Sequence, residues 1–255
     1  MTPISCFILT SPESPDARRE SAIGQLAGMD LQHCLVDGFT RKSPEVSAFY
    51  SRWKNLLLAK RSMSNGEVAT YLGHRLIWQK ILDTGLPAAL ILEDDFRFRD
   101  PATARETIRT AFEEGARWDM IKLFDYQPRK SIANYERNGV TFVLRERPGS
   151  GLVGYVISRE CCRRLLRRKS IFIPVDEELR CWFEHRISIV SVYPNVVEDG
   201  ADLFSGSILE EHRQAMKRKR NILRSLWGNL LTLRLNIKSR LWRNRVLRHA
   251  GMRQS

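Results

Sequence analysis

The chain has 255 residues, of which 43% are hydrophobic and 28% are charged, and its formal net charge is +13. This length and hydrophobic content suffice for one large folded domain or two small ones, and they exclude a disordered or fibrous chain. The positive charge lies in one segment, because thirteen of the 42 lysines and arginines lie in residues 213–255, which hold no acidic residue. Residues 1–212 are therefore formally neutral, and the charge is not a nucleic-acid-binding feature of the body.

The cysteines predict a reducing compartment. The chain has five of them, at Cys6, Cys34, Cys161, Cys162 and Cys181. They form no Cys-x-x-Cys pair and have no histidine at metal-ligand spacing, which is typical of buried free thiols. The first ten residues lack the pattern of a signal peptide, and no stretch reaches the roughly 18 apolar residues of a membrane-spanning helix. We expect a cytoplasmic protein.

The first forty residues have the pattern of a βαβ unit. A buried strand is predicted over residues 4–9, a helix from Asp16 as N-cap to Gly28, and a second strand over residues 31–36. This unit indicates an α/β fold of the nucleotide-binding type. The turn that begins at Thr10 is where a nucleotide would lie, and Arg18 and Arg19 are candidates to contact its diphosphate. The alternative for both arginines is a solvated helix face.

The next segment predicts short helices and then a long one. Residues 39–62 suggest a packed irregular or short helical segment. Ser64 followed three residues later by Glu67 is a capping box, and apolar residues at helical spacing follow it up to Gly85. His74 lies inside this helix, where a histidine is more often a packing residue than a ligand.

Three acidic residues end a buried strand near the middle of the chain. The apolar run at 88–92 stops at Glu93, Asp94 and Asp95. At the carboxyl end of a strand in an α/β sheet these acids would face the ligand crevice, and a hard divalent cation carrying phosphates would relieve their repulsion. Residues two apart on an extended chain point the same way, which favours Glu93 and Asp95 as the metal pair. The alternative is a solvated acidic turn that pairs with arginines 97 and 99.

Further strands and helices follow. The pattern predicts a helix over 101–115 capped by Asp100 or Thr103, strands over 118–124 and 140–144, a mobile loop over 127–139 between them, and a glycine-interrupted strand over 149–158. Gly151 and Gly154 predict close approach of a sugar to the backbone or, alternatively, a bulge.

A second acidic cluster follows the apolar run at 171–175. A basic helix is predicted over 159–168 before it and a last strand over 187–193 after it. Asp176 has the profile of an N-cap, and its competing role is that of a general base for an acceptor hydroxyl. Glu177 is the second candidate for that base.

Five motifs occur in an order that resembles glycosyltransferase family 25. They are Ser64-Asn65-Gly66-Glu67-Val68-Ala69, His74 with Trp78, Ile91-Leu92-Glu93-Asp94-Asp95, Gly151 with Gly154-Tyr155-Val156-Ile157-Ser158, and Pro174-Val175-Asp176. The resemblance covers about residues 4–212, and we take residues 1–212 as a catalytic domain. Within this family, the motifs resemble the bacterial type of enzyme, the lipooligosaccharide or lipopolysaccharide galactosyltransferases. The chain departs from the family pattern at Gly73, where the family has serine before the histidine.

The resemblance implies a GT-A-like Rossmann-type fold, a UDP-sugar donor, a divalent cation (Mn²⁺ or Mg²⁺) and an inverting transfer of a hexose, with galactose expected. Glu93 and Asp95 would bind the metal. Thr10, Arg18, Arg19, Asp94, Gly151 and Gly154 would contact the nucleotide sugar. Asp176, or Glu177 in second place, would deprotonate the acceptor. Alternative donors are glucose and N-acetylhexosamine.

Residues 213–255 predict a basic amphipathic tail that associates with a membrane. Leucines and two tryptophans alternate with arginines after the run Lys217-Arg218-Lys219-Arg220. A lipid-linked oligosaccharide acceptor at the inner face of the cytoplasmic membrane fits this placement. The alternatives are a solvated tail, or a non-catalytic membrane- or nucleic-acid-binding protein, which would leave the two acidic strand ends unexplained.

Overall fold

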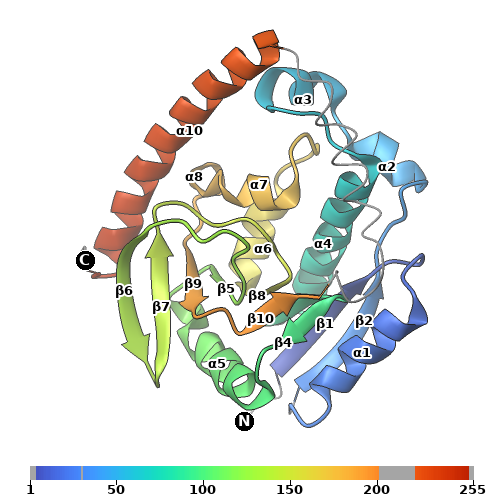
Figure 1. Ribbon diagram of the computed structural model, residues 1–255, viewed down its shortest axis with the longest axis vertical. Helices are drawn as coiled ribbons and strands as arrows, with labels where there is room; N and C mark the ends of the chain where they lie inside the picture. Colours follow the sequence, from blue (N-terminus) through green and yellow to red (C-terminus); the bar gives the residue numbers. More distant parts are fainter. Residues whose placement is uncertain (1–3, 30, 201–221, 253–255) are drawn as a thin grey trace.

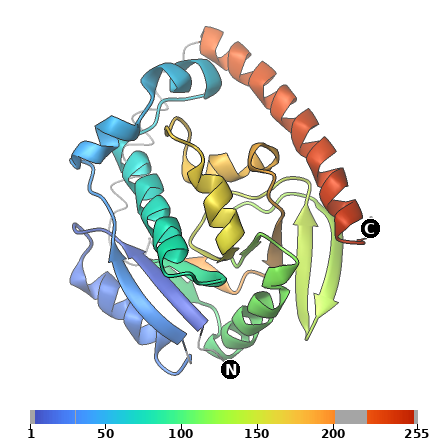
Figure 2. The same cartoon turned by 180° about the vertical axis from the view of Figure 1, so that it is seen from behind.

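The computed structural model describes residues 4–29, 31–200 and 222–252, arranged around one large mixed β-sheet (Figures 1 and 2). The strands are β1 (Ile4–Thr10), β2 (Leu31–Asp37), β3 (Ala88–Glu93), β4 (Phe96–Phe98), β5 (Met120–Lys122), β6 (Ser131–Arg137), β7 (Val140–Arg145), β8 (Gly154–Ser158), β9 (Ile189–Tyr193) and β10 (Val197–Asp199). The helices are α1 (Asp16–Leu26), α2 (Pro44–Phe49), α3 (Arg52–Leu58), α4 (Asn65–Asp83), α5 (Pro101–Glu113), the 3₁₀ turn η1 (Glu114–Ala116), α6 (Arg159–Leu166), α7 (Val175–Leu179), α8 (Trp182–His185) and α10 (Ile222–His249).

The main sheet has the strand order β2-β1-β3-β8-β5-β9-β7-β6, and β4 pairs with β10 in a separate two-stranded sheet. Strands β2, β1 and β3 are parallel, β8 is antiparallel between β3 and β5, and β5 is parallel to β9. The βαβ unit and the central apolar strand are thus confirmed, and the topology is Rossmann-like. Residues 89–92 are fully buried, as expected for a strand covered by helices on both faces.

Helix α4 begins at the predicted capping box. The Ser64 hydroxyl accepts from the Glu67 backbone N–H at 3.2 Å, and the Glu67 carboxylate accepts from the Ser64 N–H at 2.8 Å. Arg61 adds two hydrogen bonds to the same carboxylate, at 3.0 and 2.6 Å. These contacts explain Ser64 and Glu67 as structural residues.

Three local predictions were wrong. The segment 127–139 is not a loop throughout, because β6 pairs with β7 in a hairpin that closes at Asn138 and Gly139, both with positive φ. Helix α1 has Pro15 rather than Asp16 at its N-cap, and α7 has Pro174 rather than Asp176 there. Each acid therefore lies one or two positions inside its helix. Proline has no side-chain acceptor, so neither helix has a side-chain cap at this position.

The five cysteines are free, as predicted, and all except Cys34 are buried. Burial raises the pKa of the thiols of Cys6, Cys161, Cys162 and Cys181. They are packing residues in their reduced form.

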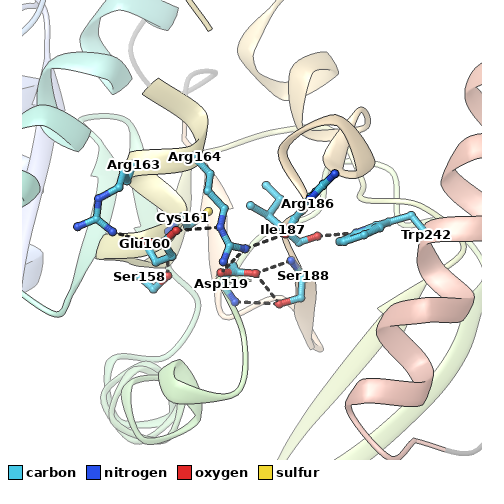
Figure 3. A network of polar contacts seen from close by, with 10 residues as sticks. All are labelled: Asp119, Ser158, Glu160, Cys161, Arg163, Arg164, Arg186, Ile187, Ser188 and Trp242. Atoms are coloured by element: carbon cyan, nitrogen blue, oxygen red, sulfur yellow. Dashed lines mark hydrogen bonds and ion pairs between the residues drawn. The ribbon is translucent and has the colours of Figure 1, made fainter. Parts of the chain in front are cut away.

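Helix α10 lies along one side of the body, in red in Figure 1. Val246 and Leu247 are buried in the main core, the Trp182 indole N–H donates to Ser239 Oγ at 2.8 Å, and the Trp242 indole N–H donates to the Ile187 carbonyl at 2.8 Å. Figure 3 shows Trp242 at the edge of a polar network centred on Asp119. Residues 222–249 of the predicted tail thus form a helix with one face docked on the body, and its association with a membrane stays a prediction.

None of the helices within the described residues is long and apolar enough to cross a membrane. The boundary that we expected at residue 212 and the basic run at 217–220 lie outside the described residues.

Candidate active site

The candidate site lies at one edge of the main sheet, where β1, β3 and β5 end. Strand β1 ends at Thr10, β3 ends at Glu93 and β5 ends at Lys122, while antiparallel β8 starts at Gly154 beside them. The carboxyl ends of parallel strands form the ligand-binding edge of an open α/β sheet. The structure therefore brings the first strand, the acidic strand and the glycine-containing strand to one place.

Asp94 connects this edge to the βαβ unit. Its Oδ2 accepts from Thr10 Oγ1 at 2.7 Å and from Ser14 Oγ at 2.5 Å, and its Oδ1 is 3.0 Å from an Arg18 nitrogen. Asp94 and Thr10 are both buried. Both carboxylate oxygens of Asp94 thus have partners in the first βαβ unit, and these contacts hold the loop after β1 in place.

Asp95 is the acid with free coordination capacity. Arg18 approaches its Oδ2 at 2.6 Å, but its Oδ1 is buried and has no hydrogen-bond partner. Burial raises the pKa of Asp95 to about 7, with the charge of Glu93 adding to the effect and Arg18 opposing it. Asp94 and Asp95 form a turn between β3 and β4, so the alternation of side chains between the two faces of the strand ends at Glu93. Arg18 therefore contacts both Asp94 and Asp95. The predicted alternative partners were wrong: it is Arg18 that pairs with these acids, whereas Arg99 pairs with Glu198.

Arg19 points to the end of β2 rather than to the acids. It donates to Asp37 at 2.7 Å and to the Ser11 carbonyl at 2.8 Å. The two arginines of α1 thus lie on either side of the loop after β1. Whether they contact a diphosphate stays a prediction.

Glu93 is held by a buried chain of hydrogen bonds that begins in α4. The Trp78 indole N–H, which can only donate, lies 3.0 Å from the Tyr155 hydroxyl. That hydroxyl lies 2.9 Å from His74 Nδ1, and His74 Nε2 lies 3.2 Å from Glu93 Oε1. Because the Glu93 carboxylate can only accept, His74 Nε2–H donates to it, and Nδ1 of the neutral ring accepts from the Tyr155 hydroxyl. His74 is fully buried and therefore positions Glu93.

Gly73, where the chain departs from the family pattern, is explained by packing. A Cβ at this position would lie 2.7 Å from Leu9 Cδ1 and 3.1 Å from Leu9 Cδ2. Helix α4 therefore packs so closely against β1 that a side chain at residue 73 would require Leu9 to shift. The close approach brings His74 to the acidic strand.

The second acidic pair lies on α7. Glu177 is 3.6 Å from Arg61, and burial raises its pKa, with Arg61 opposing and Asp176 adding to the effect. The charge of Asp176 also acts on Lys122, at the end of β5. Strand β5 is next to β8, which is next to β3. Helix α7 thus contributes acids near the same edge of the sheet that carries Glu93 and Asp95.

A buried ion pair supports the glycine-containing loop. Lys122 Nζ is 2.6 Å from Asp125 Oδ1 and donates to the carbonyl of Gly149 at 2.8 Å, and neither side chain of the pair is exposed. Burial lowers the pKa of Lys122, with Asp125 opposing the shift. The sequence analysis did not predict this pair. The signal that could have indicated it is the spacing of Lys122 and Asp125, two opposite charges three residues apart in a mainly apolar segment.

The two glycines of this loop are needed by the chain itself. Gly151 has φ +84°, and a Cβ there would lie 2.8 Å from Phe124 Cε1. A Cβ on Gly154 would lie 3.0 Å from Leu92 Cδ2. Their contact with a sugar stays a prediction.

A divalent cation fits this donor set in part. Among residues 4–29, 31–200 and 222–252, no three His, Cys, Asp or Glu side chains form a ready metal-binding group. The unpartnered Oδ1 of Asp95, the nearby charge of Glu93 and the raised pKa of Asp95 are nevertheless features that a cation-binding site is expected to show. Carboxylate oxygens are the ligands that Mg²⁺ and Mn²⁺ prefer.

The fold and this edge define an α/β protein of the Rossmann-like class with an acidic strand end. The family model of glycosyltransferase family 25 (LPS biosynthesis protein) matches residues 6–179. The chain belongs to glycosyltransferase family 25.

Individual relatives differ in activity. The chain is 28% identical over 192 residues to a Bos taurus protein called "Probable inactive glycosyltransferase 25 family member 3", covering 70% of this chain and 31% of the relative. It is 29% identical over 128 residues to procollagen galactosyltransferase 1 of Danio rerio (47% of this chain, 20% of the relative).

A bacterial relative is also similar. Lacto-N-neotetraose biosynthesis glycosyltransferase LgtE of Neisseria gonorrhoeae is 31% identical over 128 residues, covering 46% of this chain and 44% of the relative. The chain spans about a third of the length of the Bos taurus relative, a fifth of the procollagen galactosyltransferase and under half of LgtE.

Proposed function

We propose that this protein is an inverting glycosyltransferase that transfers a hexose, with galactose expected, from a UDP-sugar to the saccharide of a lipooligosaccharide or lipopolysaccharide core. The observation that carries the proposal is the acidic end of β3 in a family 25 chain, where Asp95 has an unsatisfied buried oxygen. Support for galactose comes from the relative named as a procollagen galactosyltransferase, and support for the acceptor from LgtE. A GT-A-like fold is part of the proposal.

In this mechanism Asp95 and Glu93 would hold the divalent cation, which would supply positive charge to offset that of the leaving UDP. Asp94, Thr10 and Ser14 keep the loop after β1 in place for the nucleotide. Arg18 bridges Asp94 and Asp95, and its guanidinium would offer a further positive charge to the diphosphate. Asp176 accepts the proton of the attacking acceptor hydroxyl.

Asp176→Asn is expected to lower kcat by about 10²- to 10⁴-fold, the usual contribution of a general base. Glu177→Gln is expected to have a smaller effect, because Arg61 already holds that carboxylate. Steady-state transfer rates with saturating donor measure both. If the Glu177 variant loses more activity than the Asp176 variant, the base is Glu177.

Tyr155→Phe is expected to weaken Mn²⁺ binding by about 10- to 100-fold, because His74 loses the hydroxyl that fixes its tautomer and no longer positions Glu93. Isothermal titration with Mn²⁺ measures the affinity. The control is Thr107→Val, which also removes one buried hydroxyl, in α5. This variant should bind Mn²⁺ with the affinity of the wild type. Equal Mn²⁺ affinity in wild type and Tyr155→Phe would contradict the positioning role.

A screen of UDP-sugars with extracted lipooligosaccharide and mass-spectrometric detection tests the whole proposal. A mass increase of one hexose that requires UDP-galactose is expected. Transfer from UDP-glucose or a UDP-N-acetylhexosamine would keep the enzyme class and change the donor. The second candidate is a non-catalytic protein, which the relatives named inactive favour. It predicts neither transfer nor UDP-sugar hydrolysis with any donor.

We further propose that α10 holds the enzyme at the inner face of the cytoplasmic membrane. Leu233, Ile237 and Leu241 are spaced by four residues and are 58%, 54% and 66% exposed, on the side opposite the docked Trp242 and Val246. Arginines and lysines flank this stripe, as in interfacial helices.

A further inference from the structure

A second surface with membrane-binding character lies on the body, beside the part of α10 where Leu235 packs against the cluster that contains Ala59, the C-cap of α3. Its apolar part is α3, where Trp53 is 64% exposed and Leu56 is 61% exposed. The segment between Glu45 and Glu67 contains no acidic residue and has four basic ones, at Arg52, Lys54, Lys60 and Arg61. Exposed tryptophan and leucine beside basic residues are characteristic of helices that lie in a bilayer interface.

A basic cavity adjoins α3. Its volume is about 500 Å³, and its lining includes one carboxylate, Glu184, and six cationic side chains: Lys54, Arg164, Arg167, Arg168, Lys169 and Arg186. Two of the six are neutralised, since Arg164 pairs with Glu160 and Asp119 (Figure 3), and Arg168 pairs with Glu178 and Glu184.

The other four cations are available to an anion. Lys54 donates to Ser170 Oγ at 2.8 Å, and Arg167, Lys169 and Arg186 have no carboxylate partner among the described residues. In Figure 3 the Arg186 side chain points away from the Asp119 network. Positive charges therefore outnumber carboxylates in the cavity wall, where Glu184 is the one carboxylate.

The apolar helix and the basic cavity are one continuous surface. The segment after α6 is joined to the start of α3, because the Ser51 N–H donates to the Ile171 carbonyl at 2.8 Å and the Asn55 amide donates to the Phe172 carbonyl at 2.8 Å. Lys54 lies in the cavity wall and also over the Trp53 ring, 5.5 Å from its centroid. Figure 2 looks onto α6, with α3 above it and α10 to one side.

We propose that this surface binds an anionic phospholipid bilayer, with Trp53 and Leu56 in the interface and a lipid phosphate in the basic cavity. The proposal rests on the proposed function and extends it, because the surface lies next to α7, which carries both candidate bases. Arg61, which follows α3, contacts Glu177 of α7. A bilayer at this surface would deliver a lipid-linked saccharide to α7. The charge pattern favours a bilayer over a second copy of the chain, whose matching surface would carry the same positive charge.

Sedimentation of the full chain with phosphatidylcholine vesicles, with and without phosphatidylglycerol, tests the proposal. Arg167→Gln with Lys169→Gln is expected to lower the partition coefficient for anionic vesicles about 30-fold. Trp53→Ser with Leu56→Ser is expected to lower it at least about tenfold. The matched control is Arg109→Gln with Arg137→Gln, two exposed arginines on α5 and β6, which should bind nearly as wild type.

Two results would overturn the proposal. One is equal vesicle binding by the cavity variants and by the control. The other is a concentration-dependent dimer in vesicle-free solution that Trp53→Ser abolishes, which would assign α3 to self-association. A second assay, sugar transfer to a soluble, lipid-free acceptor, separates the membrane proposal from the enzymatic one. The cavity variant and the α3 variant should both retain this transfer in full. Absence of that transfer in the wild type, with the vesicle pattern intact, would refute only the enzymatic proposal.

Discussion

Asp95→Asn is expected to lower sugar transfer by at least about 10³-fold while the protein remains folded. A bound metal contributes several kcal/mol to charge stabilisation in a transition state, and each 1.36 kcal/mol is a factor of ten in rate. The fold should tolerate the change, because Asp95 carries a buried oxygen without a hydrogen-bond partner, and burial together with Glu93 disfavours its charge. Transfer rate and thermal melting are measured on the same preparation.

The matched control is Asp83→Asn, an exposed aspartate at the far end of α4, which should leave both quantities unchanged. An Asp95→Asn protein with near-normal turnover would remove Asp95 from the metal site. A protein that loses transfer only because it unfolds would show a fall in melting temperature, which the buried environment of Asp95 does not predict.

Asp125→Ala is expected to destabilise the protein by about 3–5 kcal/mol, the usual effect of removing one partner of a buried ion pair. Lys122 is fully buried and would keep only the carbonyls of Gly149 and Ser150 as partners. Arg145, 3.5 Å from Asp125 Oδ2, would lose the same carboxylate. Urea denaturation measures the free energy of unfolding.

The double variant Lys122→Met with Asp125→Ala is the informative companion. It removes the unpaired charge of Lys122 and leaves only Arg145 without the carboxylate, so it should recover at least half of the lost stability. If Asp125→Ala alone costs less than about 1 kcal/mol, water or another residue neutralises Lys122, and the ion pair is not what supports the loop at Gly149 and Gly151.

Sequence patterns predicted the parts of this fold that depend on local chemistry. The βαβ unit, the capping box at Ser64 and Glu67, and the acidic end of β3 each follow from residues that are close in sequence. The β6–β7 hairpin was missed because β6 is largely polar, with three of its seven residues exposed, so its strand character comes from pairing with β7 rather than from burial.

The contacts within the candidate site depend on tertiary structure. Arg18 meets Asp94 and Asp95 at sequence separations of 76 and 77 residues, and His74 meets Tyr155 at a separation of 81 residues. Local patterns carry no information on such pairs. His74 could be read only as a packing residue or a ligand, and the structure gives it a third role, as the link between Tyr155 and Glu93. Gly73 shows why the helix comes close enough for that link.

The most direct test of the central claim is a calorimetric titration of UDP into the wild-type protein with Mn²⁺ and again with EDTA. The claim is that the acids at the end of β3 hold a cation that binds a nucleoside diphosphate. We predict UDP binding with Mn²⁺ and its loss both with EDTA and in Asp95→Asn. UDP binding of equal affinity in EDTA, or no binding in either condition, would contradict the claim.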